Sequence, residues 1–484
     1  MSKPSSMTPE ERKAWNEIEK RKVKVKVEQE PPLEWFERGD EVELGRYLAG
    51  KIGKEGAVVY TEGRIWVAEG LTWTEYNDER LSRIVQDFAG SYVRVQRKDD
   101  DDTWRPLNLS SSNVSGIIKQ AKAYLYDEAF FSSAPVGAAF ASTFASIQNG
   151  RVVAEPLTPA HRVKATHAAT YALPTESSEP ARVLKFLHEI WAGCADVEER
   201  IQYLMEWGGA ALMGRATQYK DTPLVVGEKD TGKSVLLNLI ATMFPATSHR
   251  SVPLHAMSSD YHRAHLSGGR INFVNELPSR ELLDGEAAKA ILSGDKVSCR
   301  RPHENCFDWL PRCAHVMAAN ELPPSRDPAL MDRLVVLDCP NVVPREKQDR
   351  GLTDALVAEV PQLALLMLLS LQALLDRGSI VRPASSDTNS LEWRAQSDPV
   401  YAWRLARLTL TTDGTYMTGD DLYREFCFWA EQNGHTRMAS NRFGIRLKSL
   451  VACRKVSVMR YYVELKPHEV ASRDVYGKPL KRVG

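Results

Sequence analysis

The sequence predicts an α/β protein built on a parallel sheet with a phosphate-binding loop. A mixed α+β region and a helical block precede this sheet, and a winged-helix-like region follows it. Two observations carry the prediction. An apolar strand runs through a glycine-rich loop into an apolar helix at Thr222–Ile240. Two later apolar runs, Ile271–Val274 and Cys313–Ala319, each end at polar residues, as parallel strands that line a site do.

The loop itself fits the pattern G-x-x-x-x-G-K-[ST] in the strand–loop–helix setting that the pattern requires. Its glycines let successive N–H groups point at phosphate oxygens, and the following helix adds the positive end of its dipole. Lys233 would reach the β- and γ-phosphates, and Ser234 would ligate Mg²⁺. A plain glycine turn is the alternative. The predicted nucleotide-binding residues are Gly227, Glu228, Lys229, Asp230, Thr231, Gly232, Lys233 and Ser234.

Composition is that of a globular protein with several domains. The 484 residues are 43% hydrophobic and 26% charged, and the formal net charge is zero, so a polyanionic partner must be met by local patches. The seven cysteines include no C-x-x-C pair and read as reduced thiols. The most apolar run, Leu363–Leu375, is shorter than the roughly 20 residues that span a bilayer. We therefore expect a buried helix there, a cytoplasmic protein and no membrane partner.

Changes in local composition and hydrophobic pattern along the chain predict the domain boundaries. Asn149-Gly150 between two β-rich runs predicts a hairpin with a type I′ turn. Ala181–Gly214 shows two amphipathic helical patterns, suited either to a collar for subunit contacts or to core packing. The stretch Arg382–Ser390 is predicted to be a linker. The predicted parts are a charged tail (1–30), an α+β helper domain (31–175), a helical collar (176–216), a nucleotide-binding domain (217–381) and a winged-helix-like domain (391–484).

Polar residues after the two later strands are the candidates for hydrolysis. Glu276 follows the strand Ile271–Val274 and would activate water, provided that this strand is a parallel neighbour of the loop's strand. Asn275 occupies a position suited to a Mg²⁺-binding carboxylate but brings no charge. Asn320, at the tip of Cys313–Ala319, would sense the γ-phosphate. A surface glutamate and a turn-forming asparagine are the alternatives.

Two arginines further on could complete the site of a neighbouring subunit. Arg333 opens an apolar strand and is the first choice for an arginine finger, and Arg326 is the second. Either residue could form a structural ion pair instead.

A basic hairpin is predicted between the carboxylate and Asn320. Two short β runs flank Arg301–Asn305, and the cations Lys296, Arg300, Arg301 and His303 cluster on them. Such a cluster would grip nucleic-acid phosphates without reading sequence. A solvated basic loop is the alternative.

The segments GEKDTGKS, RINFVNEL, KAILSGDKVSCRR and HVMAANELP, in this order, resemble the superfamily 3 helicases. The closest resemblance is to the phage and plasmid primase-helicases related to the poxvirus primase-helicase. The resemblance implies an AAA+-type motor that uses ATP and Mg²⁺ and forms a ring, a hexamer, which moves 3′ to 5′ on single-stranded DNA at a forked duplex. It also implies the cytosol of a bacterial host and a separate primase or replication initiator as partner.

Two departures and two rival functions accompany this resemblance. Asn275 stands where many relatives have Asp, and only about 30 residues precede the helper domain, so a primase activity is not expected. One rival is a nucleotide-gated origin-binding or assembly protein without unwinding activity. The other is a related AAA+-type ATPase that remodels protein or acts in phage defence. RNA as the track also stays open, because phosphate contacts do not identify the sugar.

Overall fold

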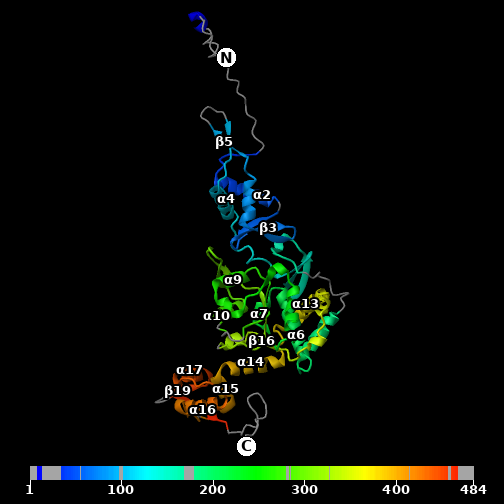
Figure 1. Cartoon of the computed structure of the whole chain (residues 1–484), viewed down its shortest axis with the longest axis vertical. Helices are drawn as coiled ribbons and strands as arrows, with labels where there is room; N and C mark the ends of the chain where they lie inside the picture. Colours follow the sequence, from blue (N-terminus) through cyan, green and yellow to red (C-terminus); the bar gives the residue numbers. More distant parts are fainter. Residues whose placement is uncertain are drawn as a thin grey trace. The chain divides into compact units, whose positions relative to one another are not determined.

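The computed structural model describes residues 8–13, 34–54, 56–96, 102–167, 179–278, 283, 285–325, 327–413, 415–455 and 459–466. The chain divides into two compact units (Figure 1). The first comprises Met1–Glu69 and Thr74–Glu128, and the second comprises Gly70–Trp73 and Ala129–Gly484. Most of the predicted tail, residues 1–30, lies outside the described residues. The domain boundaries expected at 175, 216 and 381 stay predictions.

The first unit packs helices on two mostly antiparallel sheets around one apolar core, with β1 and β5 as its parallel pair among the described residues. Each of its helices begins at a side-chain cap, for example Asp40, whose carboxylate accepts from the backbone N–H of Glu43. Its helices are α2 (Glu41–Gly53), α3 (Asp78–Gln86) and α4 (Ser111–Tyr124). Its sheets have the orders β1-β5-β6 (Trp35–Phe36, Tyr92–Gln96, Asp102–Pro106) and β2-β3-β4 (Val58–Thr61, Arg64–Glu69, Thr72–Tyr76).

The second unit begins with a three-stranded antiparallel sheet, β7-β8-β9 (Gly137–Phe140, Thr143–Gln148, Arg151–Pro156). Asn149 and Gly150 join β8 to β9 with φ angles of 51° and 75°. Two successive positive φ values are the mark of a type I′ turn, so the predicted hairpin is confirmed.

The core of the second unit is a five-stranded sheet in the order β11-β12-β15-β10-β16, in which every neighbouring pair is parallel. The predicted parallel sheet is confirmed. One condition attached to it was wrong, because β12 and the loop's strand β10 are not neighbours and β15 lies between them. The strands are β10 (Thr222–Val226), β11 (His249–Arg250), β12 (Ile271–Val274), β15 (Ala314–Ala319) and β16 (Leu334–Asp338).

Helices pack on this sheet and on one another. The packed helices are α5 (Ala181–Ile190), α6 (Val197–Leu212), α8 (Lys233–Thr242) and α13 (Val360–Arg377). Shorter elements complete the unit: α7 (Ala216–Tyr219), α9 (Asp260–Leu266), α10 (Glu286–Leu292), α11 (Pro328–Met331), α12 (Leu352–Val357), and 3-10 helices at Pro159–His161, Ala246–Ser248, Leu254–Ser258 and Arg345–Lys347.

Helix α13 is the one helix in the described part of the chain that is long and apolar enough to cross a membrane. It packs against α6 (Figure 1), where a Cβ atom on Gly209 would lie 2.2 Å from the carbonyl oxygen of Met367. Such close approach requires glycine. Leu363, Met367 and Leu371 of α13 are all buried in the core. The interpretation of this apolar run as a buried helix is therefore confirmed.

The C-terminal part has its own core around Trp403, Phe426 and Phe443. Its helices are α14 (Ala384–Ser397), α15 (Pro399–Arg407), α16 (Gly419–Gln432) and α17 (Ser440–Leu450). Its strands are β17 (Leu408–Leu410), β18 (Met417–Thr418), β19 (Cys453–Lys455), β20 (Met459–Tyr461) and β21 (Val463–Leu465), paired as β17-β21 and β18-β20-β19.

The stretch expected to be a linker, Arg382–Ser390, is mostly helical, because α14 begins at Ala384. Its serines and aspartate are residue types typical of loops, but the first N–H groups of α14 donate to carboxylates at the start of α6. Ala384 N–H donates to Glu199 at 2.7 Å, and Ser385 N–H donates to Asp196 at 2.9 Å. Carboxylates that accept from a helix N-terminus stabilise it, so a cap supplied by α6 decides the outcome.

Candidate functional site

The predicted phosphate-binding loop, Gly227–Ser234, is called the phosphate loop below and connects β10 to α8 at the carboxyl edge of the parallel sheet. Gly227 N–H donates to the carbonyl of Ala319 at 3.2 Å, which ties the start of the loop to the end of β15. A Cβ atom at Gly227 would lie 2.5 Å from the carbonyl oxygen of Cys339, so only glycine fits there. Gly232, at the other end, has a φ of +88°. Both glycines of the pattern are thus required by the fold itself.

Lys233 is the first residue of α8 and is buried under the loop. Its ammonium donates to the carbonyls of Gly227, at 2.6 Å, and Glu228. Burial lowers the pKa of Lys233, and the nearby carboxylates of Glu276 and Asp230 oppose this effect. The carbonyls that accept from it hold the ammonium at the centre of the loop.

Glu276 and Asn320 meet beside the loop although they follow different strands. The Asn320 side-chain amide donates to Glu276 Oε1 at 3.0 Å. Leu277 N–H donates to the carbonyl of Ala318 at 2.8 Å, which holds the segment after β12 against β15. Glu276, Asn320 and the preceding Asn275 are all exposed. A carboxylate and an amide therefore stand at the same sheet edge as Lys233.

Arg333 lies at the opposite edge, directly before β16. Its carbonyl accepts from Thr222 N–H at 2.8 Å, at the start of β10. Its guanidinium donates to Ser293 Oγ at 2.7 Å and to the carbonyl of Ala329 at 2.6 Å. Because β10 and β16 are parallel, Arg333 is a full strand length away from its own phosphate loop. The other candidate, Arg326, lies outside the described residues.

The predicted basic hairpin is present as β13 (Val297–Arg300) and β14 (Cys306–Trp309), an antiparallel pair. Lys296 pairs with Asp308 at 2.7 Å, and Arg301 lies 3.5 Å from Glu304 and 4.6 Å from the ring of Phe307.

The other two cations stand near the turn of the hairpin. Arg300 is exposed and donates to the carbonyl of Glu304 at 3.3 Å, and the exposed His303 has a φ of +61°. The hairpin prediction is confirmed, while two of its four cations already have a carboxylate partner.

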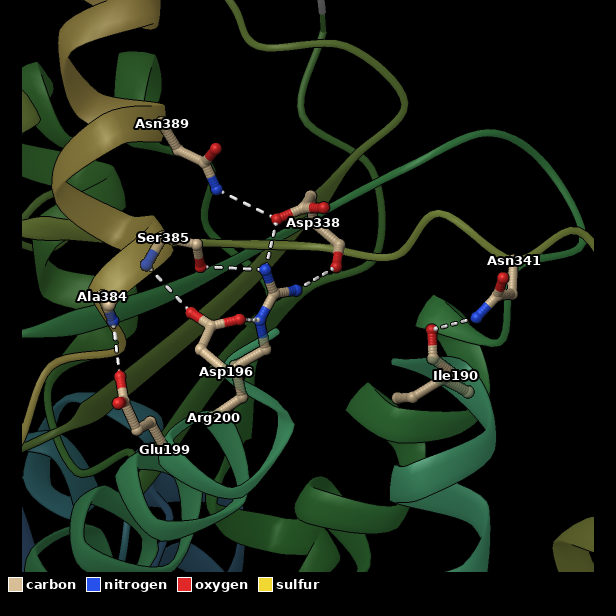
Figure 2. A network of polar contacts seen from close by, with 9 residues as sticks. All are labelled: Ile190, Asp196, Glu199, Arg200, Asp338, Asn341, Ala384, Ser385 and Asn389. Atoms are coloured by element: carbon tan, nitrogen blue, oxygen red, sulfur yellow. Dashed lines mark hydrogen bonds and ion pairs between the residues drawn. The ribbon is translucent and has the colours of Figure 1, made fainter. Parts of the chain in front are cut away.

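A buried arginine that the sequence analysis did not single out braces the loop (Figure 2). Arg200 of α6 is 2% exposed and donates to Asp196 at 2.7 Å, to the carboxylate of Asp338 at 2.8 Å and to Ser385 Oγ at 2.8 Å. The Asn389 amide also donates to Asp338, at 3.0 Å. Three elements, α6, β16 and α14, are thus joined at one guanidinium.

In this network the effect of charged and hydrogen-bonded partners on the pKa values exceeds the effect of burial. Burial opposes ionisation of both partners, but Asp338 and Asp196 raise the pKa of Arg200. Burial would likewise raise the pKa of Asp196, yet the hydrogen bonds from Ser385 and Arg200 outweigh it and lower that pKa. Both groups therefore stay charged, which is what a buried, fully bonded pair requires.

The network reaches the phosphate loop through the chain that follows Asp338. Cys339 N–H donates to the carbonyl of Val226 at 2.6 Å, and Val343 N–H donates to that of Asp230 at 2.9 Å. The Asn341 amide donates to the carbonyl of Ala192 at 2.8 Å, beyond the end of α5, and to that of Ile190 (Figure 2). One wall of the loop is therefore held by α5 and Arg200.

The sequence did contain a signal for Arg200. It lies between Val197 and Leu204 on the apolar face of a predicted amphipathic helix, and Asp196 precedes it by four residues. A charged residue on an apolar face must find partners when the helix packs.

Comparison with known proteins gives one family and a set of solved structures. A family model described as "Family of unknown function (DUF5906)" matches residues 225–333, from the phosphate loop to Arg333. Among solved structures, the chain is similar to the apo structure of the NrS-1 C terminal region (305-718) and to its A form. In both cases the identity is 12%, the TM-score is 0.45, and the alignment covers 88% of this chain and 99% of the other. No curated protein matches the chain.

Proposed function

We propose that this protein is an ATP-dependent DNA helicase of the superfamily 3 type, built on an AAA+-type motor. In this proposal it acts in the replication of a phage, plasmid or other mobile element, in the host cytosol. The observation that supports it best is the convergence of Lys233, Glu276 and Asn320 at one edge of the parallel sheet. A phosphate loop alone would support only nucleotide binding, whereas a carboxylate beside it supports hydrolysis.

The residues of the loop fit MgATP. The Gly227 position has no room for a side chain, and α8 presents its N-terminus at the end of the loop. Lys233 would exchange its carbonyl partners for phosphate oxygens. Ser234 and Asn275 would hold the Mg²⁺, which would neutralise charge on the phosphates. Because Asn275 brings no charge, this proposal implies weaker metal binding than a carboxylate would give.

Glu276 would act as the general base. Its carboxylate would accept a proton from water while the water oxygen attacks the γ-phosphorus and the bond to the β–γ bridging oxygen breaks, which leaves ADP and phosphate. The hydrogen bond from Asn320 restricts Glu276 Oε1, so Asn320 would orient the base and sense the γ-phosphate.

Arg333 would complete the site of an adjacent subunit in a ring, which we propose is a hexamer. It cannot contact its own loop, since it lies at the other end of the strands. Its hydrogen bond to Ser293 connects it to the turn that leads into β13. A movement of the Arg333 side chain would therefore displace Ser293 and the residues that lead into β13.

The hairpin cations Lys296, Arg300, Arg301 and His303 would hold the backbone of single-stranded DNA at a forked duplex and move it 3′ to 5′. The C-terminal helices α15 to α17 with strands β19 to β21 fit the predicted winged helix, a suitable module for duplex DNA or for a separate primase or initiator.

Two substitutions test this function directly. Lys233→Ala and Glu276→Gln should each lower ATP turnover and unwinding of a forked duplex by a factor of about 100 or more, as loss of a phosphate-binding or catalytic group does. Lys185→Ala and Glu189→Gln, an exposed pair on α5, serve as matched controls and should change neither. Wild-type turnover and unwinding in the first two variants would refute the proposal.

Single-stranded DNA separates the helicase from its rivals. A helicase should hydrolyse ATP faster when a single strand is added and should separate the fork. An origin-binding clamp would bind DNA without stimulated turnover, and a protein remodeller would turn over ATP without strand separation.

A further inference from the structure

Four arginines gather at the amino edge of the parallel sheet, the edge opposite to the phosphate loop. Arg250 lies in β11, Arg312 lies two residues before β15, and Arg215 lies between α6 and α7. Arg162 follows the 3-10 helix Pro159–His161. All four are half-buried. We refer to them as the arginine cluster.

Arg162 and Arg312 both donate to the turn at residues 130–133, just before β7. Arg162 Nη1 donates to the carbonyl of Phe130 at 2.7 Å and to the hydroxyl of Ser133 at 2.8 Å. Arg312 Nη2 donates to the carbonyl of Ser132 at 3.4 Å. Both guanidinium groups thus lie against the same few residues.

Lys164 extends the positive surface from this turn to Arg250. Its ammonium lies 4.1 Å from the ring centroid of Phe131, in the same turn. A Cβ atom on Gly268 would lie 3.8 Å from Lys164 Nζ and 3.8 Å from Arg250 Nη2. The two cationic groups are therefore within about 8 Å of each other, less than a Debye length.

The cluster holds its charges without carboxylates. Within the described part of the chain, none of the four arginines forms an ion pair, and Arg250 donates instead to carbonyls, such as that of His265 at 2.7 Å. Burial and the charge of Arg215 lower the pKa of Arg312. Arg215 Nε is buried without a hydrogen-bond partner. Arg215 and Arg312 therefore repel each other, and no carboxylate of the described residues offsets the charge of the cluster.

The cluster is continuous with the basic hairpin. Helix α9 connects them, because Arg263 donates to the carbonyl of Ser298 in β13 at 2.8 Å while the carbonyl of His265 accepts from Arg250. Its 7 residues span about 10 Å. Arg312 also follows the last residue of β14 by only three positions, and a fully extended chain of that length spans about 10 Å.

We propose that the arginine cluster is a second binding surface for the phosphates of single-stranded DNA, adjoining the hairpin. This inference rests on the proposed function and adds a contact region that the motor motifs do not contain. Positive charge without carboxylate partners among the described residues favours a polyanion, and the exposed Tyr261 on α9, 51% accessible, offers a ring on which an unpaired base can stack. A duplex hides its bases from such stacking, so the single strand is preferred.

The test is a titration of a labelled thirty-nucleotide oligo-dT, followed by fluorescence anisotropy without nucleotide at several salt concentrations. The double variant Arg162→Gln/Arg312→Gln removes two charges but keeps donors for the turn. Its affinity near 0.1 M salt should fall about tenfold or more, and the slope of log K against log salt should become shallower by about 1.4. Lys185→Gln, an exposed α5 cation, should bind as wild type. Thermal unfolding of both variants checks that they are folded.

The outcomes separate this inference from the proposed function. Unchanged oligo-dT affinity and salt slope in the double variant, with weakened binding in Arg300→Ala, would overturn the second surface and leave the helicase proposal intact. Failure of the wild-type protein to bind any oligo-dT would overturn both. Equal losses for oligo-dT and a blunt duplex would overturn the preference for a single strand.

Discussion

Arginines at the two edges of the parallel sheet have different hydrogen-bond partners. At the carboxyl edge, Arg200 meets the carboxylates of Asp196 and Asp338 and joins three elements beside the phosphate loop. At the amino edge, Arg312 and its neighbours meet carbonyls and one another. A buried cation that is paired with carboxylates is bound into the fold, whereas cations that meet only carbonyls and hydroxyls keep a net charge that attracts an external anion.

Arg270 is intermediate between these two cases. Arg270 precedes β12 and is half-buried, and it donates to the carbonyls of Leu212 at 2.8 Å and Gly137 at 3.0 Å. Burial lowers its pKa to about 10. It lies 3.5 Å from Nε2 of His167, which must therefore stay neutral. Carbonyl dipoles can hold the Arg270 guanidinium in the fold, but they do not cancel its charge.

The largest effect should follow removal of the paired arginine. Arg200→Met would leave Asp196, with a side chain only 7% exposed, as an uncompensated buried charge, and should lower the free energy of unfolding by about 3 kcal/mol. Urea denaturation followed by circular dichroism measures it. Arg424→Met, which removes an exposed pair with Asp421, is the control and should stay within about 0.5 kcal/mol of wild type. Equal losses of unfolding free energy in Arg200→Met and Arg424→Met would contradict the special role given to the buried pair.

An intermediate effect is expected from acid. Burial and the charge of Arg270 lower the pKa of His167 to about 3, while the unfolded chain protonates near 6.5. Between these values the unfolded state binds more protons, so stability should fall with falling pH by up to about 1.4 kcal/mol per pH unit for this histidine. His167→Gln should make the dependence of the melting temperature on pH shallower below pH 6.5. Parallel pH curves for variant and wild type would contradict this assignment. His315, whose pKa burial also lowers to about 3, is retained in both proteins.

The smallest effect should come from the amino edge. Arg312→Gln removes a charge that burial and Arg215 already disfavour, so without DNA the unfolding free energy should be unchanged or rise by up to about 0.5 kcal/mol. Comparison of its urea midpoint with that of Arg200→Met measures the difference between the edges. A loss as large as that of Arg200→Met would mean that the cluster is structural.

Local chemistry allowed much of the fold to be predicted. The strand, loop and helix around Lys233 follow from glycine freedom and apolar spacing, and β12 ends where its apolar run ends. The hairpin follows from the Asn149-Gly150 pair, whose residue types accept two adjacent positive φ angles. The candidate residues Glu276 and Asn320 could be named because they follow such strands. Sequence by itself thus determined these elements and the chemistry at their ends, but it did not reveal helix α14.

Tertiary structure alone decided which ends meet. The order of strands places β15 between β10 and β12, so Glu276 meets Asn320 at the end of β15 although its own strand is not a neighbour of β10. The cap on α14 comes from Asp196, and the arginine cluster joins residues that are distant in sequence. These contacts depend on the three-dimensional packing of long-range neighbours. No local periodicity encodes them, because charge pairing and helix capping act between groups that only the folded chain brings together.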